Sequence, residues 1–375
     1  MKTILCLLVL CTFTLNAAEI TPTTRLNQSL AFADDMNFQN LDLAIDRQLK
    51  SYDQMGLAGT IRFGTLTYKK TVLKDSLLLL KQLAANAEAC SKELPEEQCL
   101  AEFNREMNAQ FNVYQPVKKK KAAGTQFTSY YSPDMSGSRV PTERFKNPLY
   151  RQPEAAAEQN FTRTEIDFHG ALAGKGYEIF WVENSLYDIY LLQVQGGGRI
   201  NIHNADGTIE QKYLSYDGKN SRSFQMIYRY MLAKGYLKPG EAGIPHQRAF
   251  LENNPEKAEE IFNSCPSYVY FKESVEEPVG LNNIPLTEGR SLAIDSRIYK
   301  TMGMINFVRT QKASHVNENG VVVKVPFSRF FISQDTGGAI RGSARCDLYF
   351  GYGPQAELTA YNMNEMGEQY FLIKK

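Results

Sequence analysis

Apolar and polar positions follow two different patterns along the chain. Up to about residue 115, apolar residues recur at helical spacing, as in 77–83 and 100–111, which predicts helices that pack against one another. Downstream, short apolar runs are separated by glycine and proline, which is typical of strands and turns. Strands are expected at 177–182, 187–194, 265–271, 321–326, 331–333, 346–350 and 369–373, and helices at 223–233, 255–263 and 356–363. The pattern therefore predicts a mainly β protein with a helical N-terminal extension.

Candidate chemistry gathers in the stretch 331–353, FISQDTGGAIRGSARCDLYFGYG. Asp335 ends the first predicted strand of this stretch, and Asp347 lies in the second. Asp295 follows another apolar run, in GRSLAIDSR. A single aspartate after a strand is most often a turn former or a cap. Three of them together favour a site at strand ends about as strongly as they favour turns.

These motifs resemble a known enzyme family. The Asp295, Asp335 and Asp347 motifs, in that order, are similar to a three-aspartate (3D) domain, and specifically to that of the membrane-bound lytic transglycosylase A family. Four upstream motifs agree, namely YYSPDMSGSR, DFHGALAGKGYEIFWVEN, LLQVQGGGRI and CPSYVYF. The resemblance therefore runs from about Thr125 to the C-terminus.

The resemblance implies a domain organisation. We expect a double-psi β-barrel built from residues 124–132 and 264–375, with a second, barrel-like β domain at 133–263 inserted between the two pieces. Residues 19–123 would form the helical extension and a linker, which ends in the lysine run 118–121. Substrate should lie in the groove between the two β domains.

The resemblance also implies an activity. Enzymes of this family cut the glycan strands of peptidoglycan at the β-1,4 bond between N-acetylmuramic acid and N-acetylglucosamine. The sugar's own 6-hydroxyl attacks, which leaves 1,6-anhydro ends and requires one carboxyl group as acid and then base. The family's acid corresponds to Asp347, with Asp335 and Asp295 in support. Apolar neighbours would raise the pKa of Asp347, whereas Arg345, two residues away on the same strand face, would lower it.

Substrate-binding candidates come from the motifs that border the expected groove. They are Tyr130, Tyr131, Ser138, Arg139, Gln193, Gln195, Gly197, Arg199, Gly337 and Gly338. The triple glycine at 196–198 is not expected to bind a nucleotide, because β-like residues rather than a helix follow it. We expect no cofactor and no metal, since the four histidines are scattered without ligand spacing.

The N-terminus and the cysteines indicate an exported protein. Residues 1–18 read as a signal peptide, which predicts a periplasmic or cell-envelope location. Leu10 precedes Cys11, where lipid attachment requires a small residue, so no lipid anchor is expected. A disulfide is predicted between Cys90 and Cys99, while Cys265 and Cys346 could pair with each other or stay buried and free.

Charge and family suggest the partners. The 42 basic and 41 acidic residues argue against a nucleic-acid binder. The expected partners are glycan strands and, from the family's setting, cell-wall synthesis or division proteins, and we expect the protein to be a monomer.

Three other functions share some of these sequence features. Asp335-Thr336-Gly337 is the signature of an aspartic protease, but the chain holds one such motif and that chemistry needs two. A hydrolysing glycosidase would use a second carboxylate. A glycan-binding protein without a working acid would keep the groove alone. No nucleophile-elbow motif for a serine hydrolase is present.

Overall fold

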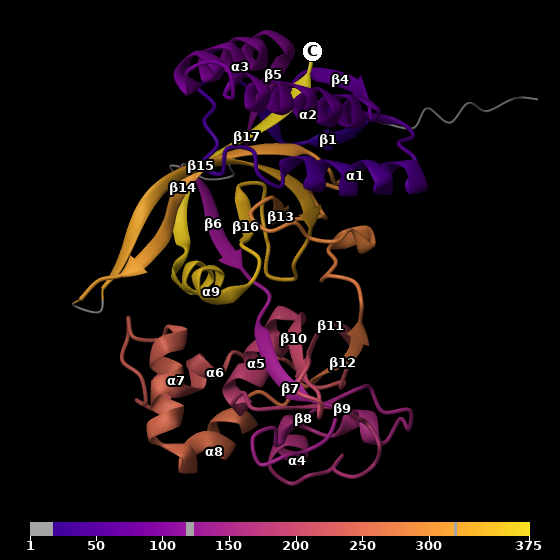
Figure 1. The fold of residues 1–375 in the computed structure, drawn as a ribbon, viewed down its shortest axis with the longest axis vertical. Coiled ribbons are helices and arrows are strands. Elements are labelled where there is room, and N and C mark those ends of the chain that lie inside the picture. Colours follow the sequence, from indigo (N-terminus) through magenta and orange to yellow (C-terminus); the bar gives the residue numbers. More distant parts are fainter. Residues whose placement is uncertain (1–17, 118–123, 319–320) are drawn as a thin grey trace, which may run out of the picture.

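The C-terminal part of the chain forms a closed barrel in the computed structural model, which describes residues 18–117, 124–318 and 321–375. Six strands follow one another around it, and the antiparallel pairing of the first with the last closes the ring. In order they are β14 (Ile305–Val316), β15 (Val322–Asp335), β13 (Ser291–Ala293), β16 (Arg345–Tyr349), β6 (Thr125–Tyr130) and β17 (Asn364–Lys374). The helix α9 (Gly353–Asn362) packs against β14 and β6 (Figure 1). The six barrel strands come from the two pieces of chain predicted to form it.

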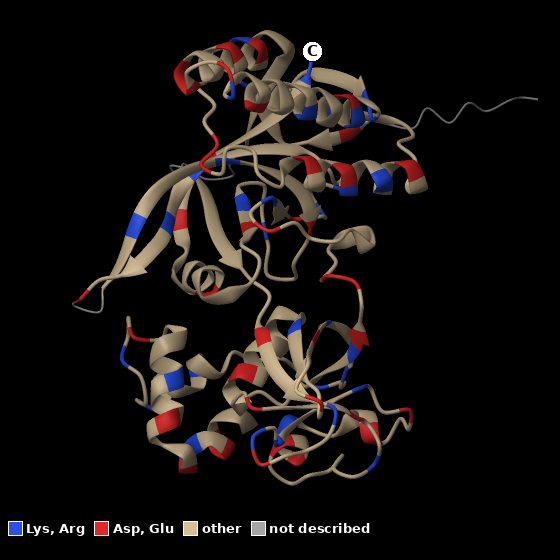
Figure 2. Ribbon diagram, viewed as in Figure 1, with Lys and Arg blue, Asp and Glu red and all other residues tan. Residues whose placement is uncertain are grey.

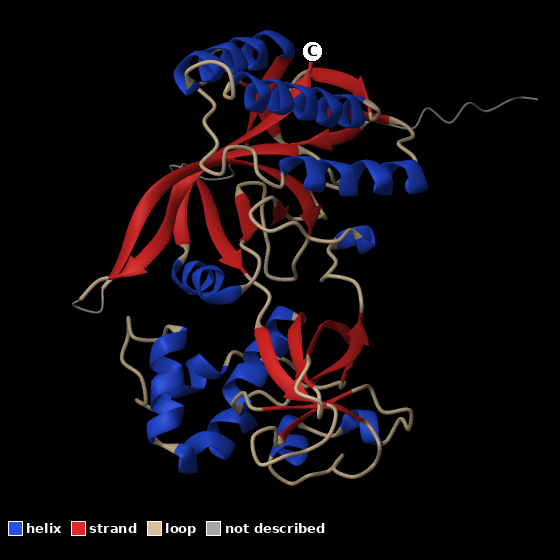
Figure 3. Cartoon of the chain, viewed as in Figure 1, coloured by secondary structure: helices blue, strands red, loops and turns tan. Residues whose placement is uncertain are grey.

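A second sheet lies below the barrel in Figure 1. Its six strands are ordered β12 (Val269–Ser274), β11 (Ile209–Lys219), β10 (Gly197–His203), β7 (Asp134–Ser138), β9 (Glu178–Val182) and β8 (Asn147–Tyr150). The helices α4 (Arg163–Asp167), α5 (Leu186–Gln195), α6 (Ile227–Ala233), α7 (Ile244–Asn253) and α8 (Ala258–Asn263) flank it (Figure 3). The strand β12 was assigned by the sequence to the barrel, but it pairs with β11 and belongs to this second sheet.

The N-terminal region is not the separate helical extension that the sequence predicted. It holds α1 (Leu41–Met55), α2 (Val72–Cys90) and α3 (Glu96–Gln110), but also β1 (Glu19–Thr21), β3 (Thr60–Phe63) and β4 (Leu66–Lys69), which form a small sheet. Two further strands, β2 (Thr23–Arg25) and β5 (Phe111–Pro116), extend the barrel sheet beyond β17. Phe32 and Phe103 pack in one core with Phe307 and Phe330 of the barrel. This shared core explains why the region cannot stand apart from the barrel.

The surface of the N-terminal helices carries both signs of charge. Acidic and basic residues alternate along them rather than gather by sign (Figure 2). Exposed pairs such as Lys74–Asp53 and Lys81–Asp46 cross between α2 and α1 at 2.5 Å. Such an interspersed pattern is that of an ordinary solvated face.

One predicted strand is a helix. Residues 187–194, expected to be extended, lie in α5, because Ser185 and Asp188 form a capping box at its start and Gly196 takes the left-handed conformation that ends it. A short apolar run fits a buried strand and a buried helix equally well. The caps at its two ends are the features that distinguish them.

The cysteines behave as two classes. Cys90 and Cys99 form the predicted disulfide between α2 and α3, with their Cα atoms 5.6 Å apart. Cys265 and Cys346 are buried and free, which settles the alternative left open above. The signal segment, apart from Ala18, and the lysine run at 118–121 lie outside the described residues. Among the described helices, none combines the length and apolar character needed to cross a bilayer.

Candidate active site

Asp347 lies in the middle of β16, between β13 and β6. Its register partners are Ala293 on β13 and Thr128 on β6. The side chain is half-buried, and one carboxylate oxygen, Oδ1, accepts a hydrogen bond from Thr128 Oγ1 at 2.6 Å. Burial raises the pKa of Asp347, against the opposing effects of the Thr128 hydrogen bond and the Arg345 charge. A carboxyl group in this environment keeps its proton to higher pH than an exposed aspartate.

Arg345 does not neutralise this carboxyl group by direct contact. Its guanidinium donates to the backbone carbonyl of Cys346. Among the described residues it forms no ion pair with a carboxylate. Its charge still lowers the pKa of Asp347, but burial outweighs it. The conflict raised by the sequence is therefore resolved in favour of a raised pKa.

Asp335 is the second carboxylate of the site. Asp335 ends β15 and pairs with Ala293 of β13. Asp347 of β16 pairs with the same residue from the other side of β13. The two aspartates thus flank β13, which places their Cα atoms roughly 10 Å apart at normal strand spacing. Asp335 accepts hydrogen bonds from Tyr130 Oη at 2.7 Å and from the Thr336 amide at 2.8 Å. Burial nevertheless raises the pKa of Asp335, and its negative charge contributes to raising the pKa of Asp347.

Two side chains of the strand β6 donate hydrogen bonds to the carboxylates of Asp347 and Asp335. Phe127 points into the core, so Thr128 and Tyr130 lie on the opposite face of the strand. Their hydroxyls donate to Asp347 and Asp335, respectively. Tyr130 was among the predicted site residues, whereas Thr128 was missed. The alternation of Thr128 and Tyr130 in TQFTSYY is the signal that could have found it.

Asp295 is ionised and holds a loop. Its carboxylate accepts from Arg297 at 2.7 and 2.6 Å and from the Gly342 amide at 2.9 Å. The Arg297 guanidinium holds the pKa of Asp295 at about 2, which is wrong for a proton donor near neutral pH. The contact with Gly342 instead fixes the end of the loop that contains Gly337 and Gly338.

A cavity of about 670 Å³ lies between the barrel and the second sheet. Five of the predicted site residues line it: Tyr130, Tyr131, Gln195, Gly197 and Asp335. Asp347 is not among its lining residues, although Tyr130 and Asp335 beside it are. The cavity also takes in Lys272, Ser274 and the connecting segment from Glu276 to Leu286. The site therefore opens onto a groove formed by both units.

Close backbone packing explains why glycines occupy positions 197 and 198 beside this groove. A Cβ at Gly197 would come within 2.6 Å of the Leu214 carbonyl oxygen, and one at Gly198 within 2.5 Å of the Pro133 carbonyl oxygen. The backbone therefore approaches too closely for any side chain. This close packing also keeps the wall of the groove at Gly197 free of a side chain.

Two predicted substrate residues make structural contacts away from the groove. Ser138 is buried in β7. Gln193 is buried in α5 and accepts a hydrogen bond from the Arg163 guanidinium. Neither lines the cavity of about 670 Å³ between the barrel and the second sheet.

Two predicted arginines are also engaged elsewhere. Arg139 pairs with Glu273 at 2.9 Å and with Glu210 at 3.2 Å. Arg199 pairs with Asp134 at 2.5 Å and lies 4.6 Å from the ring of Tyr352 in the barrel unit. Arg199 thus contributes to the contact between the two units, and Arg139 ties strands within one of them.

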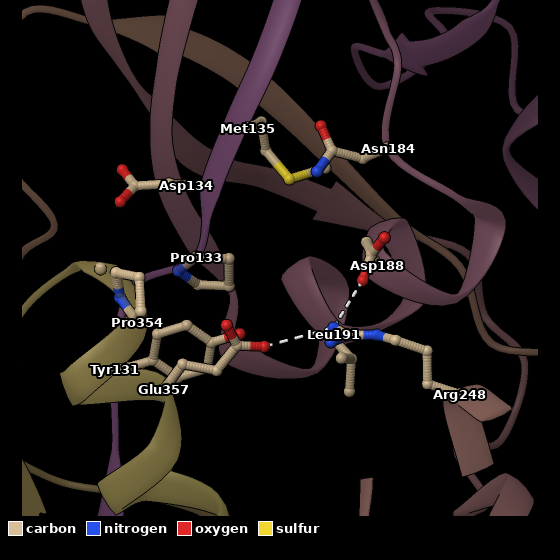
Figure 4. Close-up of a pocket in the computed structure, with 11 residues that line it drawn as sticks. Tyr131, Pro133, Asp134, Met135, Asn184, Asp188, Leu191, Arg248, Pro354 and Glu357 are labelled. Carbon is tan, nitrogen blue, oxygen red and sulfur yellow. Dashed lines mark hydrogen bonds and ion pairs between the residues drawn. The ribbon is translucent and has the colours of Figure 1, made fainter. Parts of the chain in front are cut away.

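A second cavity, of about 360 Å³, lies between α9 of the barrel and the helices of the second unit. Figure 4 shows Arg248, from α7, reaching toward two carboxylates. Its guanidinium lies 2.7 Å from Asp188 on α5 and 3.2 Å from Glu357 on α9. The sequence offered no signal for this contact, because its three members are far apart in the chain. We call Arg248, Asp188 and Glu357 the interunit clasp.

Within residues 18–117, 124–318 and 321–375, no group of three or more His, Cys, Asp or Glu side chains is arranged to hold a metal ion.

Comparison with known proteins gives a consistent result. Two family models match, the "MltA specific insert domain" over residues 126–272 and the "3D domain" over residues 290–373. The membrane-bound lytic murein transglycosylase A of Vibrio cholerae is 32% identical over 254 residues, covering 67% of this chain and 66% of that protein. Its namesake from Escherichia coli K12 is 30% identical over 249 residues, covering 66% and 65%. Each match thus spans just under two thirds of the relative.

A solved structure shares the fold over a larger part of the chain. The crystal structure of E. coli MltA with bound chitohexaose superposes with a TM-score of 0.68 and 22% identity, covering 94% of both chains. At that identity the likeness supports the fold, including the arrangement of a barrel and a second sheet.

Proposed function

Because this chain belongs to the membrane-bound lytic murein transglycosylase A family, we propose that it cleaves the glycan strands of peptidoglycan. The bond cut is the β-1,4 linkage between N-acetylmuramic acid and N-acetylglucosamine. The observation that carries the proposal is Asp347, whose pKa burial raises and which lies next to Asp335 and Tyr130 at a groove between two units. A lytic transglycosylase needs such a protonated carboxyl group at an open groove.

Asp347 is the acid of the reaction. Its proton passes to the glycosidic oxygen as the bond from that oxygen to the anomeric carbon breaks. The 6-hydroxyl oxygen of the same muramic acid then bonds to the anomeric carbon, and its proton returns to Asp347. The product is a 1,6-anhydro end, and the carboxyl group is ready for another cycle. Burial supports this role because it keeps Asp347 protonated before the reaction.

The other two aspartates support this acid. Asp335 places negative charge beside Asp347, which raises its pKa and favours the positive charge that develops on the sugar ring. Asp295 stays ionised and holds the loop at Gly342. The groove residues Tyr130 and Gln195, together with the backbone at Gly197, bind the glycan. The E. coli MltA structure that shares this fold holds bound chitohexaose, which supports glycan binding as the role of this groove.

Location and barrel type complete the proposal. The relatives are named membrane-bound, and we place this chain in the periplasm, at the peptidoglycan it would cut. The double-psi description of the six-stranded barrel and the domain boundaries drawn from the sequence stay predictions.

The test is mass spectrometry of peptidoglycan digested with the purified protein. We expect 1,6-anhydro muropeptides from the wild type and none from Asp347→Asn, with Asp42→Asn on the exposed face of α1 as a matched control. Reducing ends in place of anhydro ends would identify a hydrolase in which Asp335 activates water. Glycan binding without any product would identify a binding protein.

A further inference from the structure

Thr128 donates a hydrogen bond to Asp347, the proposed acid, although no sequence motif assigns Thr128 a role. We propose that Thr128 is a positioning residue: its hydroxyl holds Asp347 Oδ1, so that Oδ2 carries the proton and faces the bond to be cut. This inference rests on the proposed function, since it gives Asp347 the role of acid. Thr128 itself neither gains nor loses a proton in the reaction.

The strand pairing places this hydroxyl. β6 and β16 lie side by side (Figure 1). They pair in parallel with Thr128 opposite Asp347, so both side chains leave the sheet on the same face. The Oγ1–Oδ1 distance is 2.6 Å, which lies within the range of O–H···O hydrogen bonds. Since Oδ1 is occupied by this donor, the proton of the neutral acid is left to Oδ2.

The Thr128 hydroxyl also affects the balance between the neutral and the ionised form of Asp347. Burial and the charge of Asp335 favour the neutral form of Asp347, while Arg345 and the Thr128 hydrogen bond favour the ionised form. Tyr130, the remaining titratable group that faces the site from β6, donates to Asp335. Thr128 is thus the one hydrogen-bond donor to Asp347 found among the described residues, and it stabilises the carboxylate formed when the proton leaves.

The same strand offers a matched control. Thr125 is buried and its hydroxyl has no hydrogen-bond partner among the described residues. Thr125→Val therefore makes the same chemical change on β6 without breaking a hydrogen bond. Thr128→Ser keeps the hydroxyl and removes only a methyl group.

The experiment measures kcat, KM and the pH profile of anhydro-muropeptide release for these variants. For Thr128→Val we expect kcat to fall about tenfold or more, the usual cost of a lost hydrogen bond to a charged group. KM should change little. The alkaline limb of the profile should move to higher pH, because the carboxylate has lost a stabilising donor. Thr128→Ser should recover most of kcat, and Thr125→Val should match the wild type.

A second readout does not depend on turnover. Carbon-13 NMR of the Asp347 carboxyl group should show its titration at higher pH in Thr128→Val than in Thr125→Val. Thr128→Ala makes the same comparison if the valine variant fails to fold. An unchanged titration, or a change in KM alone, overturns the role of Thr128 while the proposed function stands. Full activity in Asp347→Asn removes Asp347 as the acid, and the absence of any cleavage product from the wild type overturns the proposed function itself.

Discussion

A buried ion pair joins the N-terminal region to the barrel, and its removal should destabilise the whole protein. Arg290 donates to both oxygens of Asp34, at 2.6 and 2.8 Å, and both side chains are fully buried. Asp34 also accepts from the Phe330 amide at 3.0 Å. In Asp34→Ala the guanidinium stays buried without its partner, which costs about 3–5 kcal/mol.

This loss translates into a measurable shift in Tm. With an unfolding entropy of about 2 cal/mol/K per residue and 375 residues, we expect Tm to fall by roughly 4–6 °C in Asp34→Ala. The assay is differential scanning calorimetry, with denaturant unfolding as a check. Asp46→Ala, which breaks an exposed pair with Lys81, should lower stability by less than about 1 kcal/mol. The double variant Asp34→Ala/Arg290→Met should regain part of the loss, because no charge is left buried.

The reasoning depends on the N-terminal region being part of the barrel core. If Asp34→Ala and Asp46→Ala lowered Tm by the same small amount, the region would be an appendage, as the sequence first suggested. The shared core described above would then be wrong.

Three further predictions follow from the structure. Replacing Cys90 and Cys99 together by Ser should cost about 2–3 kcal/mol in denaturant unfolding, the chain-entropy value for a short loop, and an unchanged midpoint would contradict this. Arg248→Met should free the two units to separate, so small-angle scattering should show a larger radius of gyration than for the wild type at low salt, with the difference shrinking as salt screens the interunit clasp. The lowered pKa of Asp295 stabilises the fold above the pKa of an unfolded aspartate, and this contribution is lost as pH falls toward about 2. Asp295→Asn should therefore lose stability at pH 6 relative to the wild type and lose little near pH 2, which thermal unfolding at the two pH values checks.

The sequence predicted parts of the barrel strands β15, β16 and β17, because short apolar runs and glycine turns are local signals, but it gave no strand at β14 (Ile305–Val316). It misassigned residues 187–194, where periodicity alone cannot separate a buried strand from a buried helix. It also missed β5, which pairs with the distant strand β17, and β2, which pairs in turn with β5. Local patterns carry no information about such partners.

The residues of the candidate site also divide into those that the sequence indicated and those that only the tertiary structure shows. Asp335 and Asp347 stood out because of their motifs, whereas Thr128 is identified as important only by its register with β16. Arg139 and Arg199 were reasonable substrate ligands by residue type, but each is already paired with carboxylates of the second unit. Which arginine is free to bind a ligand depends on tertiary contacts that the sequence does not display.

The last strand of the chain has a consequence for biogenesis. β17 pairs with β14, β6 and β5, so these three strands have no common neighbour until residues 364–374 have left the ribosome. The barrel therefore cannot close before residues 364–374 have been synthesised, and its closure depends on contacts between segments far apart in the sequence, which form slowly.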